Sequence, residues 1–475
     1  MSTFLHENIH WWQHIGSTTG LMLSLANPLR GHANLGHLRE FLQTVGPIKP
    51  IKRYAEKYHG GAMHQSNIIV NNYYDIDFFS RIIFSPDALK QASTSAYFES
   101  VGHAFFITYA SAIAALGTTF DKDFANFPHP GELEKQYLAL RDAKHEGFFY
   151  KSPIGVPPIG ILHLFEGQAR FSQLQYLFNW SGGSLSWEEV RQRGMLSSPY
   201  GDAFNWFLKL TGSKWPPSID HPLINAFLLA CDIAINPSEG YPFPVHCPET
   251  FISDNDPGTR FVTICWILKN KCPHALSYIR ACSRNEYTAV SKEICSHMVT
   301  HSPDSISRKI VEWAANQEPL ITLMKEEEAF RFSPENFPLR LLFAKHIAFL
   351  RDKQKRPEFF CWPGAWLAGE LISTDEEALF NRHQAMFIDK QDSRTIVPIL
   401  FAGKENDNIY DTFNTFYFAN ILYDQMRQWI TEEGPFTYDY KWLTEDEELS
   451  EMERFAGKQF EDEFGVHPKT FRGVD

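Results

Sequence analysis

The chain has 475 residues, of which 44% are hydrophobic and 15% aromatic, including 40 phenylalanines. This composition predicts a compact globular protein and excludes general disorder, and the length suffices for one large core or two to three smaller ones. The formal net charge of −13 argues against binding to nucleic acid or to an anionic membrane. Seven cysteines without a paired framework indicate reduced thiols in a cytoplasmic protein.

The chain begins with a motif that can hold a metal ion. Residues 6–10 read His-Glu-Asn-Ile-His. On a helix, His6 and His10 lie one turn apart on one face and could bind a single ion. Glu7 lies about 100° around the helix, where it could reach a water on that ion. Two nitrogen donors and an open water position suit zinc.

A helix is expected from Thr3 to Ala26, ending before Pro28, and it is apolar on most sides. Gln13 falls within about 20° of His6 on this helix, so the two share a narrow polar stripe. Because buried polar groups need partners, a metal centre with supporting hydrogen bonds would explain the stripe. The small residues 16–20 form a patch that another helix could approach closely.

No signal peptide is expected, because the motif follows the first five residues directly. Zinc helices of this type normally follow a sheet, so the sequence either lacks an upstream part or completes its site with later segments. This question stays open at the level of sequence.

The elements that follow are expected to be mainly helical, beginning with a helix over residues 34–44. Residues 67–79 are rich in Ile, Val, Tyr and Phe and predict the main strand of the first half. Such a strand could line a cleft and pair with an extended substrate, or could be a surface hairpin. Helices are expected over residues 95–116 and 130–144, and the apolar run 104–116 is too short to span a bilayer.

Residues 161–180 predict a second helix of the same construction as the first. His163, Glu166, Arg170 and Gln173 recur at spacings of three, four and three, and therefore form one polar stripe on an apolar helix. Two such helices are most simply explained if their stripes face each other across a shared ion. Glu166 would then be the third ligand. Together with Gln13, the other three are candidates for supporting hydrogen bonds or for substrate binding.

The His-Glu-x-x-His stretch with Gln13, joined to a later Glu-Gly-x-Ala helix, resembles zinc-dependent metallopeptidases of the gluzincin type. In that family two histidines of one helix and a glutamate of a later helix bind zinc, and the motif glutamate is the general base. The resemblance implies that His6, His10 and Glu166 are zinc ligands and that Glu7 is the base. It covers about the first 180 residues and is specific only at the motif. Glu99, one turn before His103, is the rival third ligand.

The second half gives weaker signals. Helices are expected over residues 187–193, 200–211, 221–235, 306–325, 336–352, 411–430 and 444–464, with a small hairpin from 385–388 and 395–401. The proline-rich stretch 236–256 predicts a long loop or a domain boundary. Cysteines and histidines between residues 265 and 301 lack a Cys-x-x-Cys pair, so buried thiols are favoured there over a structural zinc.

The sequence as a whole predicts a mostly α-helical protein with minor β structure. A zincin-like metal-binding domain, residues 1–235, would pack on a mainly helical C-terminal domain, residues 236–475. The leading hypothesis is a zinc metallopeptidase acting on a peptide or protein substrate through a metal-activated water. The alternatives are a non-catalytic protein-interaction protein with a vestigial or structural metal site, and a zinc hydrolase of a non-peptide amide or ester. The oligomeric state is not predicted.

Overall fold

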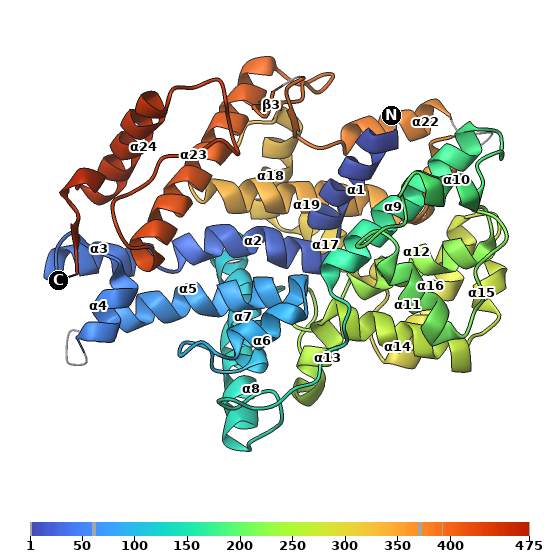
Figure 1. Ribbon diagram of the computed structural model, residues 1–475, viewed down its shortest axis with the longest axis horizontal. Helices are drawn as coiled ribbons and strands as arrows, with labels where there is room; N and C mark the ends of the chain where they lie inside the picture. The colour runs from blue at the N-terminus through green and yellow to red at the C-terminus, as the bar shows by residue number, and fades with distance from the viewer. Residues whose placement is uncertain (1, 59–62, 369–372, 392, 475) are drawn as a thin grey trace.

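The computed structural model describes residues 2–58, 63–368, 373–391 and 393–474 and is built almost entirely from helices (Figure 1). The predicted mostly α-helical class is confirmed. Within these residues, strands form only two short pairs. β1 (Ile48–Lys49) is parallel to β4 (Arg472–Gly473), and β2 (Phe387–Asp389) is antiparallel to β3 (Ile396–Pro398). The second pair confirms the predicted hairpin.

The helices of the first half begin with the motif. They are α1 (Ser2–Gly16), α2 (Thr18–His32), α3 (Leu35–Thr44), α4 (Ile51–Lys57), α5 (Met63–Phe84), α6 (Asp87–Ala92), α7 (Val101–Phe120), α8 (Pro130–Asp142), α9 (Ile161–Trp180), α10 (Trp187–Gln192), α11 (Asp202–Thr211) and α12 (Pro222–Ala234).

The second half is equally helical. Its helices are α13 (Phe251–Asn255), α14 (Pro257–Asn270), α15 (Ala275–Tyr278), α16 (Arg284–Met298), α17 (Pro303–Asn316), α18 (Glu318–Ala329), α19 (Phe337–Lys355), α20 (Pro357–Cys361), α21 (Pro363–Trp366), α22 (Thr374–Arg382), α23 (Asn406–Thr431) and α24 (Leu449–Phe464). Two 3-10 turns, Pro248–Thr250 and Pro468–Thr470, complete the set in the described part of the chain.

The strand predicted at residues 67–79 is wrong, because this segment lies inside α5. Its buried apolar side chains recur every three to four residues, which is the period of a helix, and include Ile69, Val70, Tyr73, Ile76 and Phe79. Burial of this face against neighbouring helices outweighs the preference of β-branched residues for strands. The segment therefore offers no strand to a substrate and is no hairpin.

The helix predicted from residue 3 to 26 is divided in two. α1 ends at Gly16, and Ser17 adopts an extended conformation whose hydroxyl accepts a hydrogen bond from the Gly20 amide (2.9 Å) and caps α2. α2 then continues through Pro28 to His32, beyond the predicted end. The motif helix is thus short, and α2 starts afresh from its own cap.

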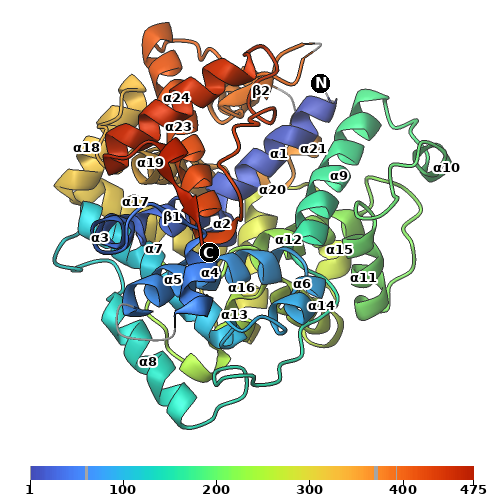
Figure 2. The ribbon, with the colours of Figure 1, turned by 60° about the vertical axis from the view of Figure 1, so that its left-hand side comes forward.

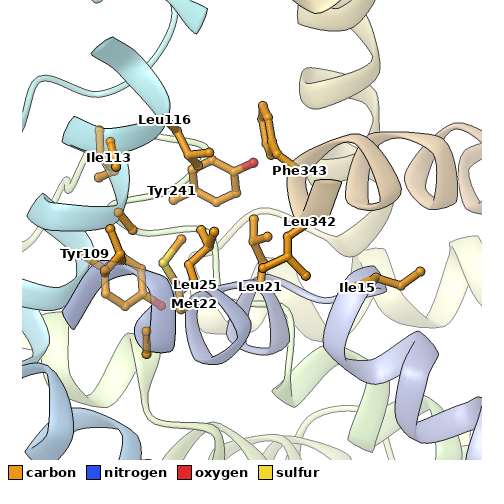
Figure 3. Close-up of a cluster of buried hydrophobic side chains, with 14 of the residues drawn as sticks. Ile15, Leu21, Met22, Leu25, Tyr109, Ile113, Leu116, Tyr241, Leu342 and Phe343 are labelled. Atoms are coloured by element: carbon orange, nitrogen blue, oxygen red, sulfur yellow. The ribbon is translucent and has the colours of Figure 1, made fainter. Parts of the chain in front are cut away.

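The largest hydrophobic cluster joins the start of the chain to its later helices. Figure 3 shows side chains of α1 and α2, among them Ile15, Leu21 and Leu25, facing α7 and α19 with Tyr241 between them. Residues from both sides of the predicted boundary at 235 and 236 therefore share this core.

α7 is the one helix in the described ranges that is long and apolar enough to cross a membrane. In this protein 67% of the most apolar stretch of α7 is buried inside the molecule. A helix buried in this way is compatible with a soluble protein, in which it forms part of the core.

Candidate metal centre

α1 and α9 lie side by side, as Figure 1 and Figure 2 both show, and they bring the predicted ligands together. The Nε2 atoms of His6 and His10 are 3.2 Å apart. The Oε2 atom of Glu166 lies 3.4 Å from each of these nitrogens. The three ligand atoms thus form a nearly equilateral triangle between two helices that are distant in sequence.

This triangle has the size that a zinc ion requires. Zinc–ligand bonds of about 2.0–2.1 Å in a tetrahedron separate neighbouring ligand atoms by about 3.3–3.4 Å. Glu166 Oε2 is buried and has no hydrogen-bond partner in the described structure. A buried carboxylate oxygen without a partner is costly, and a cation would satisfy it. Two imidazole nitrogens and one carboxylate oxygen, with a fourth position left over, fit a catalytic zinc site.

The electrostatic surroundings keep His6 in the form that binds metal. Burial, followed by the nearby His10 and Arg170, lowers the pKa of His6 to about 3. The imidazole is therefore neutral at physiological pH, with a lone pair available for coordination.

Gln13 fixes the orientation of His10. The Nδ1 atom of His10 lies 2.8 Å from Gln13 Oε1, and since that oxygen can only accept, Nδ1 donates and Nε2 keeps its lone pair. Gln13 Nε2 in turn donates to the Phe165 carbonyl (3.0 Å) and to Gln168 Oε1 (2.9 Å). Gln13 thereby has the supporting position expected from the sequence, whereas Gln168 was not predicted.

Arg170 contributes a positive charge at the edge of this group. Its guanidinium lies 4.1 Å from the centre of the Tyr200 ring, and it donates a hydrogen bond to Gln173. The Tyr200 ring meets His6 edge to face with centroids 5.9 Å apart. Tyr200 precedes α11 and shares no periodic pattern with the motif, so sequence reasoning did not find it.

Two other candidates have different roles. His163 Nδ1 accepts a hydrogen bond from the Gly160 amide (3.2 Å) and caps the start of α9. Glu99 accepts a hydrogen bond from the Tyr137 hydroxyl (2.5 Å) and lies beside His103, 3.8 Å from its Nε2. Glu99 is not part of the group formed by His6, His10 and Glu166, so the rival third ligand belongs to a separate polar cluster.

Glu7 is exposed on α1, next to the two histidines in sequence. Within the described part of the chain no hydrogen bond or ion pair holds its carboxylate. The side chain is therefore free to contact solvent.

No family model, curated protein or solved structure matches this chain.

Proposed function

We propose that this protein is a zinc-dependent metallopeptidase in which His6, His10 and Glu166 hold the ion and Glu7 is the general base. One observation carries the proposal: three ligand atoms from two helices lie 3.2 to 3.4 Å apart. The buried oxygen of Glu166, which has no hydrogen-bond partner in the described structure, and the hydrogen bond from His10 to Gln13 support it.

A zinc ion bound here would lower the pKa of a water molecule towards neutrality and polarise a substrate carbonyl. The free carboxylate of Glu7 would accept the proton of the attacking water and deliver it to the leaving amine. Arg170, held against Tyr200 beside His6, would offer its guanidinium to a substrate carboxylate or to the developing oxyanion. Gln13 would keep His10 in the coordinating tautomer throughout.

As part of the same proposal, we infer the cellular compartment from the free cysteines. All seven cysteines are free in the structure, and six of them are buried. Reduced cysteines are typical of the cytoplasm, where we place the enzyme and its peptide substrates.

The test separates metal binding from catalysis. Elemental analysis of His6→Ala is expected to find one zinc fewer per chain than in the unmodified protein. Glu7→Gln is expected to keep the zinc content and to lower the rate of peptide-library hydrolysis by about 10²–10⁴-fold, the contribution of a general base. Glu40→Gln changes the same chemical group at an exposed helical position of α3 and should leave both measurements unchanged.

Unchanged hydrolysis by Glu7→Gln would overturn the assignment of the base. Equal zinc contents in His6→Ala and the unmodified protein would overturn the metal centre. Ester and non-peptide amide substrates assayed in parallel distinguish a peptidase from a hydrolase of another class.

A further inference from the structure

A second group of potential ligands lies on α16 and in the turn between α14 and α15. Cys272, Glu293 and His297 each place one ligand atom so that all three lie within 4.8 Å of one another. The sequence favoured buried thiols without a metal in this region, and it gave no reason to include Glu293. Glu293 and His297 both lie on α16, and the packing of α16 against α14 brings them to Cys272.

Two rigid elements position these side chains. Cys272 follows the end of α14, where its amide donates to the Ile267 carbonyl (3.1 Å) and its carbonyl accepts from the Ala275 amide (3.1 Å) at the start of α15. Glu293 and His297 lie one turn apart on α16, so both side chains leave the same face of the helix. The three ligands therefore need no rearrangement of the backbone to approach each other.

The surroundings of Cys272 differ from those of the other buried thiols. All six buried cysteines, Cys272 included, border the same apolar cluster, but among the described residues the other five belong to no ligand group. Cys272 is also fully buried, but its sulfur has a carboxylate and an imidazole beside it. Glu293 also forms an ion pair with His274, with Nε2 and Oε2 3.1 Å apart. A ligating carboxylate held by a further polar neighbour is typical of metal sites.

We propose that Cys272, Glu293 and His297 bind a divalent cation of the zinc type, which joins the turn between α14 and α15 to α16. Sulfur, nitrogen and oxygen ligands of this kind all occur on zinc, whereas magnesium and calcium prefer oxygen alone. The Cys272 thiol gives its proton to solvent when the cation binds. The exposed His297 leaves the site accessible to ions from solution. A cation held by side chains of two adjoining elements would stabilise the fold.

The proposal does not depend on the metallopeptidase activity, and a spectroscopic probe separates the two sites. The chelator-treated full-length protein is titrated with Co²⁺ while thiolate-to-cobalt charge-transfer absorption is followed in the near ultraviolet. The site at His6, His10 and Glu166 has no sulfur ligand and contributes nothing to this absorption. We expect the band to saturate at one thiolate-bound cobalt per chain, to disappear on addition of excess zinc, and to persist in His6→Ala.

Two variants identify the ligands. Cys272→Ser should lose the band, and His297→Ala, which alters an exposed side chain and leaves the core intact, should lose it as well. Cys247→Ser removes the exposed thiol and should retain the band. Absence of the band in the unmodified protein, or its survival in either Cys272→Ser or His297→Ala, would overturn the proposal.

Discussion

Gln13 is the residue through which α1 and α9 share hydrogen bonds at the candidate metal centre. It accepts from His10 and donates to the Phe165 carbonyl and to Gln168. Groups that orient a metal-bound histidine commonly change metal affinity by about 10–100-fold when they are removed. The supporting role of Gln13 can therefore be measured apart from the ligands themselves.

We expect Gln13→Ala to bind zinc about 10–100-fold more weakly than the unmodified protein, in competition with a chromogenic chelator at fixed pH. Gln175→Ala is the matched control. Gln175 is buried like Gln13, but it lies on α9 and donates to Asn225 (2.6 Å) instead of contacting a candidate ligand. That variant should lose stability and keep its zinc affinity. Equal zinc affinities in the two variants would contradict the role assigned to Gln13.

At the scale of single residues, helical periodicity in the sequence predicted which candidate ligands share a helix face. His6, His10 and Gln13 share a helical face by spacing, and so does Glu166 with its own stripe. Tyr200 could not be predicted, because its contact with His6 arises from the packing of a loop. Gln168 follows Glu166 by two residues and so lies off the predicted stripe, and only its contact with Gln13 reveals its role.

At the scale of elements, glycines permit the close packing that the small-residue patch predicted. A Cβ atom on Gly16 would lie 2.2 to 2.8 Å from the ring of Phe349 in α19. The approach of α1 to α19 therefore requires glycine at this position, and the contact lies on the same helix as the candidate ligands.

Gly16→Ala is expected to lower the free energy of unfolding by about 1–3 kcal/mol, the usual cost of overpacking. Gly36→Ala in α3 should instead raise it by about 0.5–1 kcal/mol, because no atom lies within 4 Å of the added carbon and alanine favours the helix. Urea denaturation of both variants measures the difference. A stabilising Gly16→Ala would contradict the packing described here.

His346 in α19 links the stability of this packing to pH. Its Nδ1 donates to the Ile15 carbonyl (2.7 Å) near the end of α1, and burial lowers its pKa to about 4. Between pH 4 and 6.5 the unfolded chain therefore binds protons that folded His346 does not. The contribution of His346 to the free energy of unfolding therefore rises with pH across this window and is lost as the pH falls through it.

We expect the metal-free protein to become less stable from pH 6.5 down to pH 4 in urea titrations. His346→Gln should show a shallower decline, because glutamine does not titrate, although His6 and His14, whose pKa values desolvation also lowers, retain part of the effect. An equal decline in both proteins would show that His346 does not carry this pH dependence.

α5, which contains the segment predicted as a strand, shows that residue composition alone does not distinguish a strand from a helix. Its run of Ile, Val, Tyr and Phe reads as a strand when residues are considered singly, yet its buried positions follow a helical period. Local propensity is weak compared with burial against neighbouring helices, and those neighbours are not visible in a single sequence. The division of the first helix at Ser17 has a local signal, the capping hydroxyl, which the apolar pattern on both sides masked.

At the scale of the whole molecule, later segments of the chain pack against the face of α1 that points away from the candidate metal centre. The ring of Trp12 packs against Phe349, Phe359, Phe360 and Phe380. Its indole donates to the His383 carbonyl (2.7 Å). The side chain of Asn8 accepts from the Ala385 amide (2.6 Å). Two-domain organisation was predicted from a proline-rich stretch, which gives no information about such long-range packing.

These contacts predict that residues 1–235 do not fold as an independent metal-binding unit. Without α19, α20 and α22, Trp12 and its apolar neighbours would be exposed to water, and each large buried side chain contributes about 1.5–3 kcal/mol. The fragment is expected to lack a cooperative thermal transition in circular dichroism and to bind zinc far more weakly than the full-length protein. A cooperative transition together with full-length zinc affinity would instead show that the first 235 residues form a domain whose contacts with the later helices are dispensable.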